Sequence, residues 1–218
     1  MPATLAQERF YRAPAEAGGG PAPSDSSSHR RAPEAAAKPF FTIGHSTRPL
    51  AEFVALLREA QVQLVVDVRL LPGSRTNPQY NQDALARELT AYQIGYEHIA
   101  ALGGRRRKSA DVPPSVNAFW QNASFHNFAG YAMGEPFQAA CAKLRNLGHA
   151  RACAIMCAEA VWWRCHRRII ADYLLAVGET VLHIMGPGHI VPAQMTDAAR
   201  RDESGSLIYP PEQSAFRF

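Results

Sequence analysis

Residues 152–177 read ACAIMCAEAVWWRCHRRIIADYLLAV, and the fold class follows from the order of the patterns in them. The apolar run from Ala152 to Met156 is typical of a buried strand, whereas Cys165 to Val177 has the periodicity of a helix, which Gly178 ends. Two thiols, a carboxylate, an imidazole and several guanidiniums lie at the junction. An α/β protein binds its ligands where a strand gives way to the next helix. The stretch therefore predicts a strand–helix unit with a polar site between the two elements.

The same alternation of strand and helix continues along most of the chain. Further strands are predicted at residues 40–44, 64–68, 95–99 and 180–184. Further helices are predicted at residues 49–60, 83–92 and 136–147, a polar loop at 103–115, and an aromatic segment of ambiguous structure at 116–133. Alternating elements indicate βαβ units with right-handed crossovers. We therefore predict an α/β fold, a three-layer αβα arrangement with a mostly parallel central sheet in a single domain.

The two ends of the chain differ from this domain in composition. Residues 1–38 are rich in Ala, Pro, Gly and Ser and have almost no aliphatic pattern, which predicts a disordered tail. The α/β domain is expected over residues 39–200. Residues 201–218 carry Pro210-Pro211 and little pattern, so a loose extension is expected there.

Composition and charge bound the class of protein. The chain has 218 residues, 47% of them hydrophobic, and a net charge of +4, which mildly favours an anionic small molecule or nucleic acid as partner. It lacks the run of about 18 apolar residues that a membrane span requires. All four cysteines lie between Cys141 and Cys165 with no secretory signal before them, so we expect reduced thiols in a cytoplasmic protein.

Polar clusters follow several of the predicted strands, and the carboxyl ends of parallel strands meet at one edge of a sheet. We therefore expect these clusters to form one site. The candidate catalytic residues are His45, Cys157, Glu159 and Cys165. The candidate residues for binding an anion or substrate are Ser46, Thr47, Arg48, Asp67, Arg69, Ser74, Arg75, Arg105, His166 and Arg167.

The chemistry of these residue types supports the assignment, and each has a structural alternative. The imidazole of His45 titrates near neutral pH and suits proton transfer, but it could instead bond a backbone carbonyl and fix its own turn. Arginines such as Arg69 and Arg75 suit phosphate or carboxylate because a planar guanidinium donates two hydrogen bonds at once, although Arg75 could be an ordinary surface residue. Asp67 is expected either to form a buried pair with Arg69 or to position it.

The two central cysteines also allow more than one interpretation. Cys157 or Cys165 could be an activated thiolate, because helix N-termini lower thiol pKa values, or simply a small buried apolar residue. Glu159 is expected to be buried and to need Arg167 or Arg69 as partner. No cofactor is predicted. Zinc held by the two cysteines, His166 and a remote histidine is a minor alternative, because the spacing is not a recognised zinc pattern and adjacent helical residues diverge by about 100°.

Taken together, the motifs closely resemble the domain of unknown function 488 family. They are Thr42 to Arg48 (TIGHSTR), Asp67-Val68-Arg69 with Pro72, Ser74 and Arg75, Leu102-Gly103-Gly104-Arg105, Cys157-Ala158-Glu159, and Cys165-His166-Arg167. The later Ile169 to Asp172 and His183-Ile184 match as well. The resemblance spans roughly residues 40–200 and implies a site at these motifs, but the family brings no settled activity. The long tail and the tryptophans after Val161 depart from the family pattern.

A weaker likeness is to rhodanese-like and cysteine-phosphatase folds, in which a loop from Cys to Arg holds an anion. Here the stretch from Cys157 to Arg164 is one residue longer than the phosphatase spacing and lacks glycine. This likeness concerns the fold alone.

Three hypotheses for function follow. The favoured one is an enzyme, a hydrolase or transferase, that acts on a phosphorylated, nucleotide or nucleic-acid substrate, with Trp162 and Trp163 stacking a base. The second is rhodanese-like, cysteine-dependent transfer of sulfur, phosphate or redox equivalents. The third is a non-catalytic nucleic-acid-binding protein that uses the basic run from Arg105 to Lys108.

Overall fold

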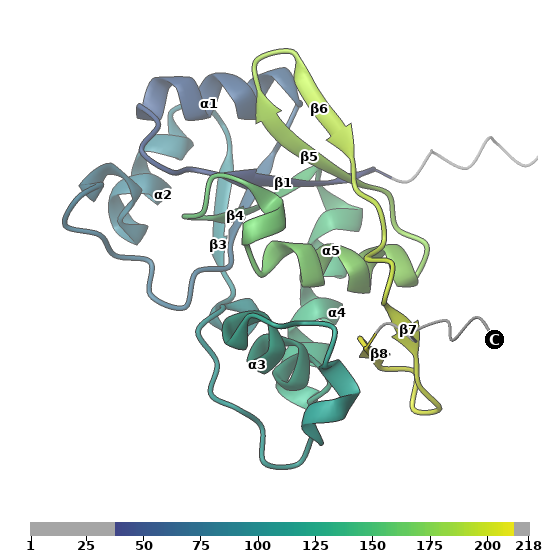
Figure 1. Cartoon of the computed structure of the whole chain (residues 1–218). Coiled ribbons are helices and arrows are strands. Elements are labelled where there is room, and N and C mark those ends of the chain that lie inside the picture. The colour runs from purple at the N-terminus through teal and green to yellow at the C-terminus, as the bar shows by residue number, and fades with distance from the viewer. Residues whose placement is uncertain (1–37, 212–218) are drawn as a thin grey trace, which may run out of the picture. The chain divides into compact units, whose positions relative to one another are not determined.

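Strands alternate with helices in the computed structural model of the protein, which describes residues 38–211 (Figure 1). The central sheet contains β1 (Phe40–Gly44), β2 (Leu64–Asp67), β3 (Gly95–His98), β4 (Cys153–Cys157), β5 (Val181–Gly186) and β6 (His189–Pro192). The α-helices are α1 (Leu50–Glu59), α2 (Gln82–Thr90), α3 (Ala123–Ala132), α4 (Glu135–Ala150) and α5 (Arg167–Ala176). Short 3₁₀ helices are η1 (Pro78–Tyr80), η2 (Ala100–Leu102), η3 (Pro114–Asn117) and η4 (Trp162–Arg164). The predicted tail at residues 1–38 lies, apart from Lys38, outside the described residues.

The strand order in the sheet is β3-β2-β4-β1-β5-β6. The first five strands are parallel and β6 pairs with β5 in the antiparallel sense, which confirms the mostly parallel sheet. β6 was not predicted. It is a short edge strand that follows the turn at Gly188, where φ is +63°, and it ends at Pro192, a residue that sheets accept only at an edge or a strand end.

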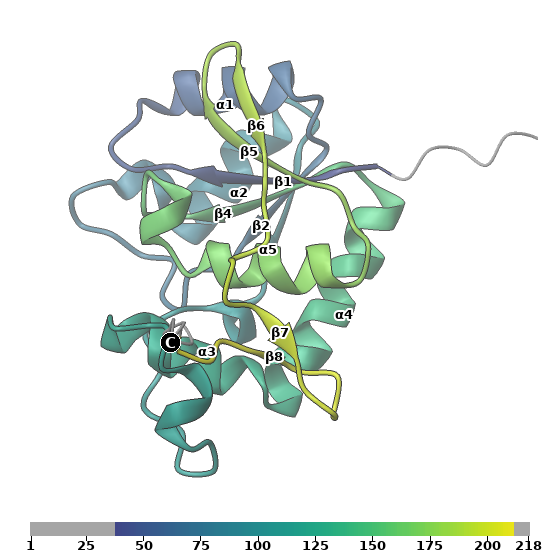
Figure 2. The same ribbon diagram turned by 45° about the vertical axis from the view of Figure 1, so that its right-hand side comes forward.

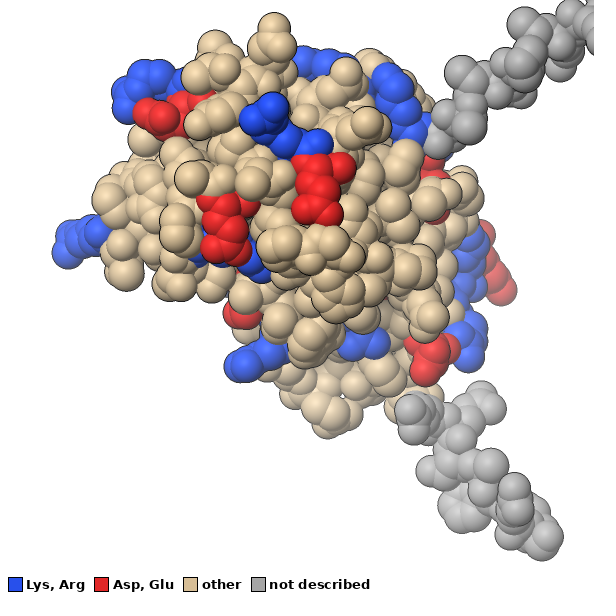
Figure 3. Space-filling model, turned by 90° about the horizontal axis from the view of Figure 1, so that it is seen from above, with Lys and Arg blue, Asp and Glu red and all other residues tan. Residues whose placement is uncertain are grey.

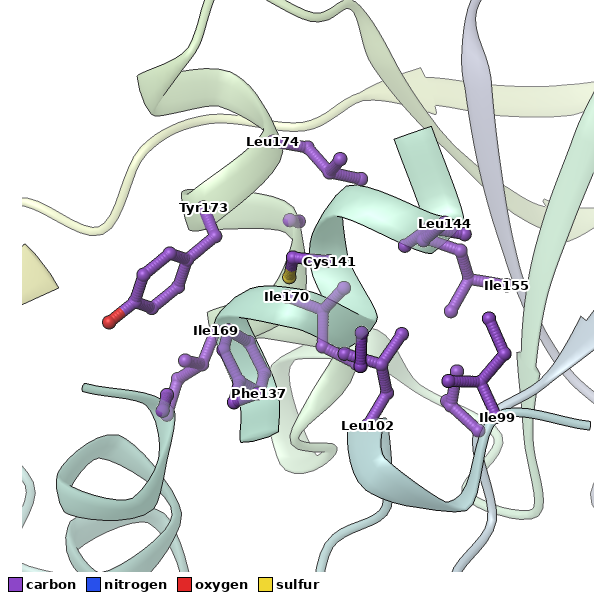
Figure 4. Close-up of a cluster of buried hydrophobic side chains, with 14 of the residues drawn as sticks. Ile99, Leu102, Phe137, Cys141, Leu144, Ile155, Ile169, Ile170, Tyr173 and Leu174 are labelled. Atoms are coloured by element: carbon purple, nitrogen blue, oxygen red, sulfur yellow. The ribbon is translucent and has the colours of Figure 1, made fainter. Parts of the chain in front are cut away.

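Side chains that alternate along the strands create one apolar cluster on each face of the sheet. On one face, Val65 and Met156 pack with Phe53 and Leu57 of α1 and with side chains of α2. On the other face, Ile155 packs with residues of α4 and α5 that include Phe137, Leu144 and Ile170 (Figure 4). The helices therefore cover both faces of the sheet, with α1 and α2 on one side and α4 and α5 on the other (Figure 2). The α/β fold with three layers is confirmed.

The ambiguous segment 116–133 contains α3. The helix begins after Asn122, whose side-chain carbonyl accepts hydrogen bonds from the backbone N–H groups of Ser124 at 2.9 Å and Phe125 at 3.4 Å. Asparagine is a preferred residue at this position because it satisfies N–H groups that lack a helical partner. The aromatic composition of the segment obscured this start signal.

The segment that follows residue 200 is not loose as far as Pro211, contrary to the expectation. It forms a small hairpin of β7 (Arg200–Arg201) and β8 (Leu207–Ile208), and both Leu207 and Tyr209 are buried. Tyr209 donates its hydroxyl hydrogen to Asp172 Oδ2 at 3.0 Å, and Asn117 accepts from the Tyr209 N–H at 3.1 Å. Residues 212–218 lie outside the described part of the chain.

Asp172 makes this attachment dependent on pH. Burial raises the pKa of Asp172 to about 6, although hydrogen bonds from Thr196 and Tyr209 oppose the shift. The native state thus keeps a proton that the unfolded chain releases near the ordinary value of 3.8. The contribution of Asp172 to the free energy of unfolding should therefore fall by about 2–3 kcal/mol as the pH rises from 4 to about 7, and stay constant above that.

Urea unfolding of the Asp172→Asn variant and of the native protein at several pH values between 4 and 7 measures this effect. The variant should gain stability relative to the native protein as the pH rises, whereas the exposed Asp197→Asn control should not. A difference between Asp172→Asn and the native protein that is the same at every pH would contradict the prediction.

Candidate functional site

A cavity of about 800 Å³ lies where the loops that follow β1, β2 and β4 meet, at the carboxyl edge of the sheet. This is the edge at which the sequence predicts the polar clusters to converge. Ten of the predicted residues line the cavity: His45, Ser46, Thr47, Arg69, Ser74, Arg105, Cys157, Glu159, Cys165 and His166. The lining contains three arginines and a single acid. The cavity therefore has a positive balance of charge.

The loops after β1 and β4 form the floor of the site and are joined through their backbones. The N–H of His45 donates to the Cys157 carbonyl at 3.0 Å, and the N–H of Ser46 donates to the Ala158 carbonyl at 3.0 Å. Gly44 permits this approach, because a Cβ atom there would lie 2.0 Å from the carbonyl oxygen of Glu159. The histidine turn and the thiol turn are thus held together by main-chain contacts.

Arg69 is held in a buried network behind the cavity. Its Nε lies 2.9 Å from Asp67 Oδ1, and its Nη2 donates to Asp67 Oδ2 at 2.5 Å and to the Tyr80 carbonyl at 2.7 Å. The Tyr96 hydroxyl donates to the same carboxylate at 2.7 Å. Asp67 is completely buried and does not line the cavity. The pair is therefore structural, and it fixes the direction of the Arg69 guanidinium.

His45 has its ring nitrogens engaged on both sides. Nδ1 donates to the Ser46 carbonyl at 2.8 Å, so Nε2 carries the lone pair and accepts from Arg69 Nη1 at 3.3 Å. The ring stacks on Tyr80 with 4.0 Å between centroids. Burial lowers the pKa of His45 to about 4, so the ring is neutral at pH 7. This arrangement matches the alternative in which His45 fixes its turn, and it also positions Arg69.

Cys157 and Cys165 lie side by side at the cavity wall. Burial by itself would raise the pKa of Cys165. The hydrogen bond from Cys157 and the contacts with Arg167 and His166 outweigh the effect of burial, and the pKa of Cys165 therefore lies well below its usual range. The pKa of Cys157 is raised well above its usual range, first because it is hydrogen-bonded to Cys165 and then because it is buried. The surroundings of the two sulfurs therefore favour an ionised Cys165 and a neutral Cys157.

Arg167 supplies a buried positive charge beside this sulfur. Its side chain is 1% exposed, Nε donates to Cys165 Sγ at 3.3 Å, and Nη2 donates to the Glu159 carbonyl at 2.6 Å. Within residues 38–211 no carboxylate forms an ion pair with Arg167. A buried charge needs an opposite charge near it. Cys165, whose pKa is lowered, can supply the opposite charge. Arg167 thus supports the site from behind without lining the cavity.

The expectation for Glu159 is wrong. The residue is exposed rather than buried, and its backbone carbonyl, not its carboxylate, is the acceptor for Arg167. Glu159 comes two positions after Cys157, the last residue of β4, and belongs to the lining of the cavity. Glu159 is therefore accessible to a ligand in the cavity.

Two of the predicted binding arginines lie elsewhere. Arg48 forms an ion pair with Glu52, one helical turn away in α1, and donates to the Met185 carbonyl at 2.9 Å, which ties the first loop to β5. Arg75 is exposed on the loop after β2 and does not line the cavity. Ser74, which directly precedes Arg75, does line the cavity, and its hydroxyl accepts from the Asn77 N–H at 3.0 Å.

The aromatic side chain at the cavity is not a tryptophan. Trp162 stacks on His183 with 4.5 Å between centroids, Trp163 is 48% exposed, and neither lines the cavity. Instead, Phe125 lines it from the start of α3 and stacks on Trp120 with 4.8 Å between centroids. Ser124 and Arg164 also line the cavity and were not predicted. Asn122, which caps the start of α3, could have located Ser124 and Phe125. No signal in the sequence distinguishes Arg164.

The basic run from Arg105 to Lys108 does not form one patch. Arg105 lines the cavity, while Arg106 donates to the carbonyls of Gly103 and Ala100 at 2.7 Å and covers the ring of Tyr131. Arg107 and Lys108 are exposed on the loop and do not line the cavity. On the face seen in Figure 3, basic side chains are interspersed with acidic ones and form no continuous basic surface.

One group in the described residues has the composition of a metal site. The ligand atoms of Cys157, Cys165 and His166 all lie within 4.8 Å of one another. No remote histidine belongs to the group, in contrast to the zinc alternative considered from the sequence.

None of the helices between residues 38 and 211 combines the length and the apolar character that crossing a membrane requires. The chain matches no curated protein and no solved structure. The family model described as Domain of unknown function DUF488 matches residues 49–174. This range is narrower than the resemblance predicted from the sequence, because it excludes β1 and the turn that carries His45. The match covers more than half of the chain, from the start of α1 into α5, and includes the thiol turn and the Cys165-His166-Arg167 motif. The chain therefore belongs to the family of the domain of unknown function DUF488.

Proposed function

We propose that the protein is an enzyme that binds a phosphorylated small molecule, most readily a nucleotide, in the cavity and transforms it at the wall formed by Cys157 and Cys165. The observation that carries the proposal is the lining of the cavity, in which three arginines face a single acid at the carboxyl edge of a parallel sheet. The volume of about 800 Å³ falls within the range of small-molecule sites, and this edge is where α/β folds bind ligands.

The lining supports separate roles for its members. Arg105 and Arg164 are exposed and suit a phosphate group, which guanidiniums bind through paired hydrogen bonds. Arg69 has Nε and Nη2 committed to Asp67 and Tyr80, but Nη1 carries two hydrogens and has one recorded acceptor, His45. Phe125 offers a ring face to a base, and Glu159 is the carboxylate that could carry a proton.

Calorimetric titration with nucleoside monophosphates, the matching nucleosides and inorganic phosphate tests this function. A monophosphate should bind at least about tenfold more tightly than its nucleoside, a difference of about 1.4 kcal/mol. Arg164→Ala should weaken the monophosphate about tenfold and leave the nucleoside unchanged, because only the phosphate contact is lost.

The matched control is Arg58→Ala, which removes an exposed arginine from the last turn of α1, away from the cavity. This variant should bind like the native protein. Absence of binding by every phosphorylated probe, or equal weakening by Arg58→Ala and Arg164→Ala, would contradict the proposed function.

A second candidate, cysteine-dependent group transfer, is favoured by the contact between Cys165 and Arg167. A thiolate beside a guanidinium is the state in which cysteine acts as a nucleophile. This candidate uses the same cavity and differs in that a covalent bond forms to Cys165.

A further inference from the structure

We propose that Cys157, Cys165 and His166 bind a divalent metal ion of the zinc class, with its fourth coordination position open to the cavity. The three residues lie on the cavity lining and come from the end of β4 and the approach to α5. The inference deepens the proposed function, on which any catalytic role of the metal rests. The metal site itself stands on the geometry of the three side chains.

The separations are close to those of a tetrahedral site. Cys165 Sγ lies 3.7 Å from His166 Nδ1, and all three ligand atoms are within 4.8 Å of one another. Zinc lies about 2.3 Å from sulfur and about 2.0–2.1 Å from nitrogen, so the ligands of a tetrahedral site are about 3.5–3.8 Å apart. Each pair of ligand atoms therefore lies within about 1.3 Å of the separation that such a site needs.

The histidine is held in the orientation that a metal ligand needs. His166 Nε2 lies 3.3 Å from the Val68 carbonyl, to which it must donate a hydrogen, so Nδ1 of the neutral ring carries the lone pair. A ring that donates one N–H to a carbonyl and offers the other nitrogen to a metal is the usual arrangement around protein-bound zinc. The edge-on contact with Phe128, at 5.0 Å between centroids, restrains the ring further.

The sequence argued against a metal site at Cys165 and His166 because neighbouring residues in a helix diverge, and the backbone conformation removes this objection. Cys165 and His166 were expected to lie within one helix, where neighbouring side chains diverge. Cys165 is instead extended, with φ −123° and ψ 144°, and α5 begins only at Arg167. The two neighbouring side chains can therefore face the same point.

A positive charge lies beside one of the two sulfurs. Arg167 Nε donates to Cys165 Sγ at 3.3 Å. Two thiolates balance the charge of a divalent ion, which leaves the positive charge of Arg167 to favour an anionic fourth ligand. Three protein ligands with one open position are the pattern of catalytic rather than structural zinc sites. Glu159 lines the same cavity and suits proton exchange with a ligand in that position.

Titration of the reduced, chelator-treated full-length protein with Co²⁺ and then Zn²⁺ tests the site. One equivalent of Co²⁺ should produce a thiolate-to-metal charge-transfer band and the intense d–d bands of four-coordinate cobalt, and Zn²⁺ should abolish both. Cys165→Ser, Cys157→Ser and His166→Gln should each weaken cobalt binding at least about 100-fold. Cys141→Ala and His126→Gln, which change residues outside the cluster, should leave it unchanged.

Alkylation followed by mass spectrometry provides a measurement on the unmodified sequence, so the test does not depend on whether a variant folds. Zn²⁺ should slow labelling of Cys157 and Cys165 and leave Cys141 unaffected. Absence of the charge-transfer band, or no protection of these two cysteines by Zn²⁺, would overturn the proposal. Rapid labelling of Cys165 that Zn²⁺ does not slow would favour cysteine-dependent transfer instead.

The two proposals fail in distinguishable ways. Nucleotide titration of the metal-free protein and of Arg164→Ala tests anion binding alone, because Arg164 is not one of the three metal ligands. Metal binding without nucleotide binding would overturn the proposed function and leave the metal site. Nucleotide binding without metal binding would overturn the metal site and leave the proposed function.

Discussion

Replacement of Asp67 by alanine should lower the free energy of unfolding by about 3–5 kcal/mol, because it leaves the buried guanidinium of Arg69 without its counterion. Asp67 is fully buried and accepts from Arg69 Nε and Nη2, from the Arg69 N–H at 2.9 Å, and from the Tyr96 hydroxyl. The remaining partners of the guanidinium, the Tyr80 carbonyl and His45, are neutral. Urea unfolding monitored by circular dichroism measures the loss.

Two controls show whether the loss arises from the buried charge. Tyr96→Phe removes one hydrogen bond from the same carboxylate and should cost about 1 kcal/mol. Glu52→Ala removes the partner of Arg48 at the surface and should cost no more than about 1 kcal/mol. A loss for Asp67→Ala as small as that for Tyr96→Phe would show that Arg69 is not held by this charge.

The second large effect is expected for Gly44→Ala, which should destabilise the protein by about 3 kcal/mol and abolish ligand binding in the cavity. The added Cβ would lie 2.0 Å from the Glu159 carbonyl oxygen and 2.5 Å from that of Ala160. Both neighbours are backbone atoms, so relief requires the loop after β4 to move away from the loop after β1. Such a movement breaks the hydrogen bond between the His45 N–H and the Cys157 carbonyl.

Gly73→Ala is the matched control, because a Cβ at Gly73 meets nothing within 4 Å although the residue lines the same cavity. This substitution should change the free energy of unfolding by less than about 1 kcal/mol. Denaturant unfolding and a cobalt titration of both variants make the comparison. If Gly44→Ala retained the stability and the ligand binding of Gly73→Ala, the close approach of the two loops would not be needed.

Strand periodicity was enough to predict the parallel sheet and the edge at which the polar clusters meet. The convergence of His45 and Cys157 followed from topology, because both residues come at the ends of parallel strands that the structure places next to each other. Edge strand β6 was missed because its pattern is short and ends in proline. Helix α3 was missed because its composition is aromatic rather than amphipathic.

The direction of individual side chains could not be predicted in the same way. Ser46 and Arg105 have positive φ values of 48° and 58°, and Cys165 is extended just before a helix. None of these conformations is encoded by the hydrophobic period. The burial of Glu159 was wrongly predicted, and neither Trp162 nor Trp163 lines the cavity.

The position of β1 in the sheet has a consequence for how the molecule folds. β1 lies between β4 and β5, so a strand from the beginning of the domain pairs with two strands from its far end. Pairings between such distant parts of a chain form slowly. During synthesis β1 cannot pair with β4 and β5 until most of the domain has been made. A fragment cut to residues 49–174 lacks β1 and β5 and exposes one side of β4 as an unpaired edge, which invites aggregation. Expression of the isolated segment is therefore a poor route to a working protein.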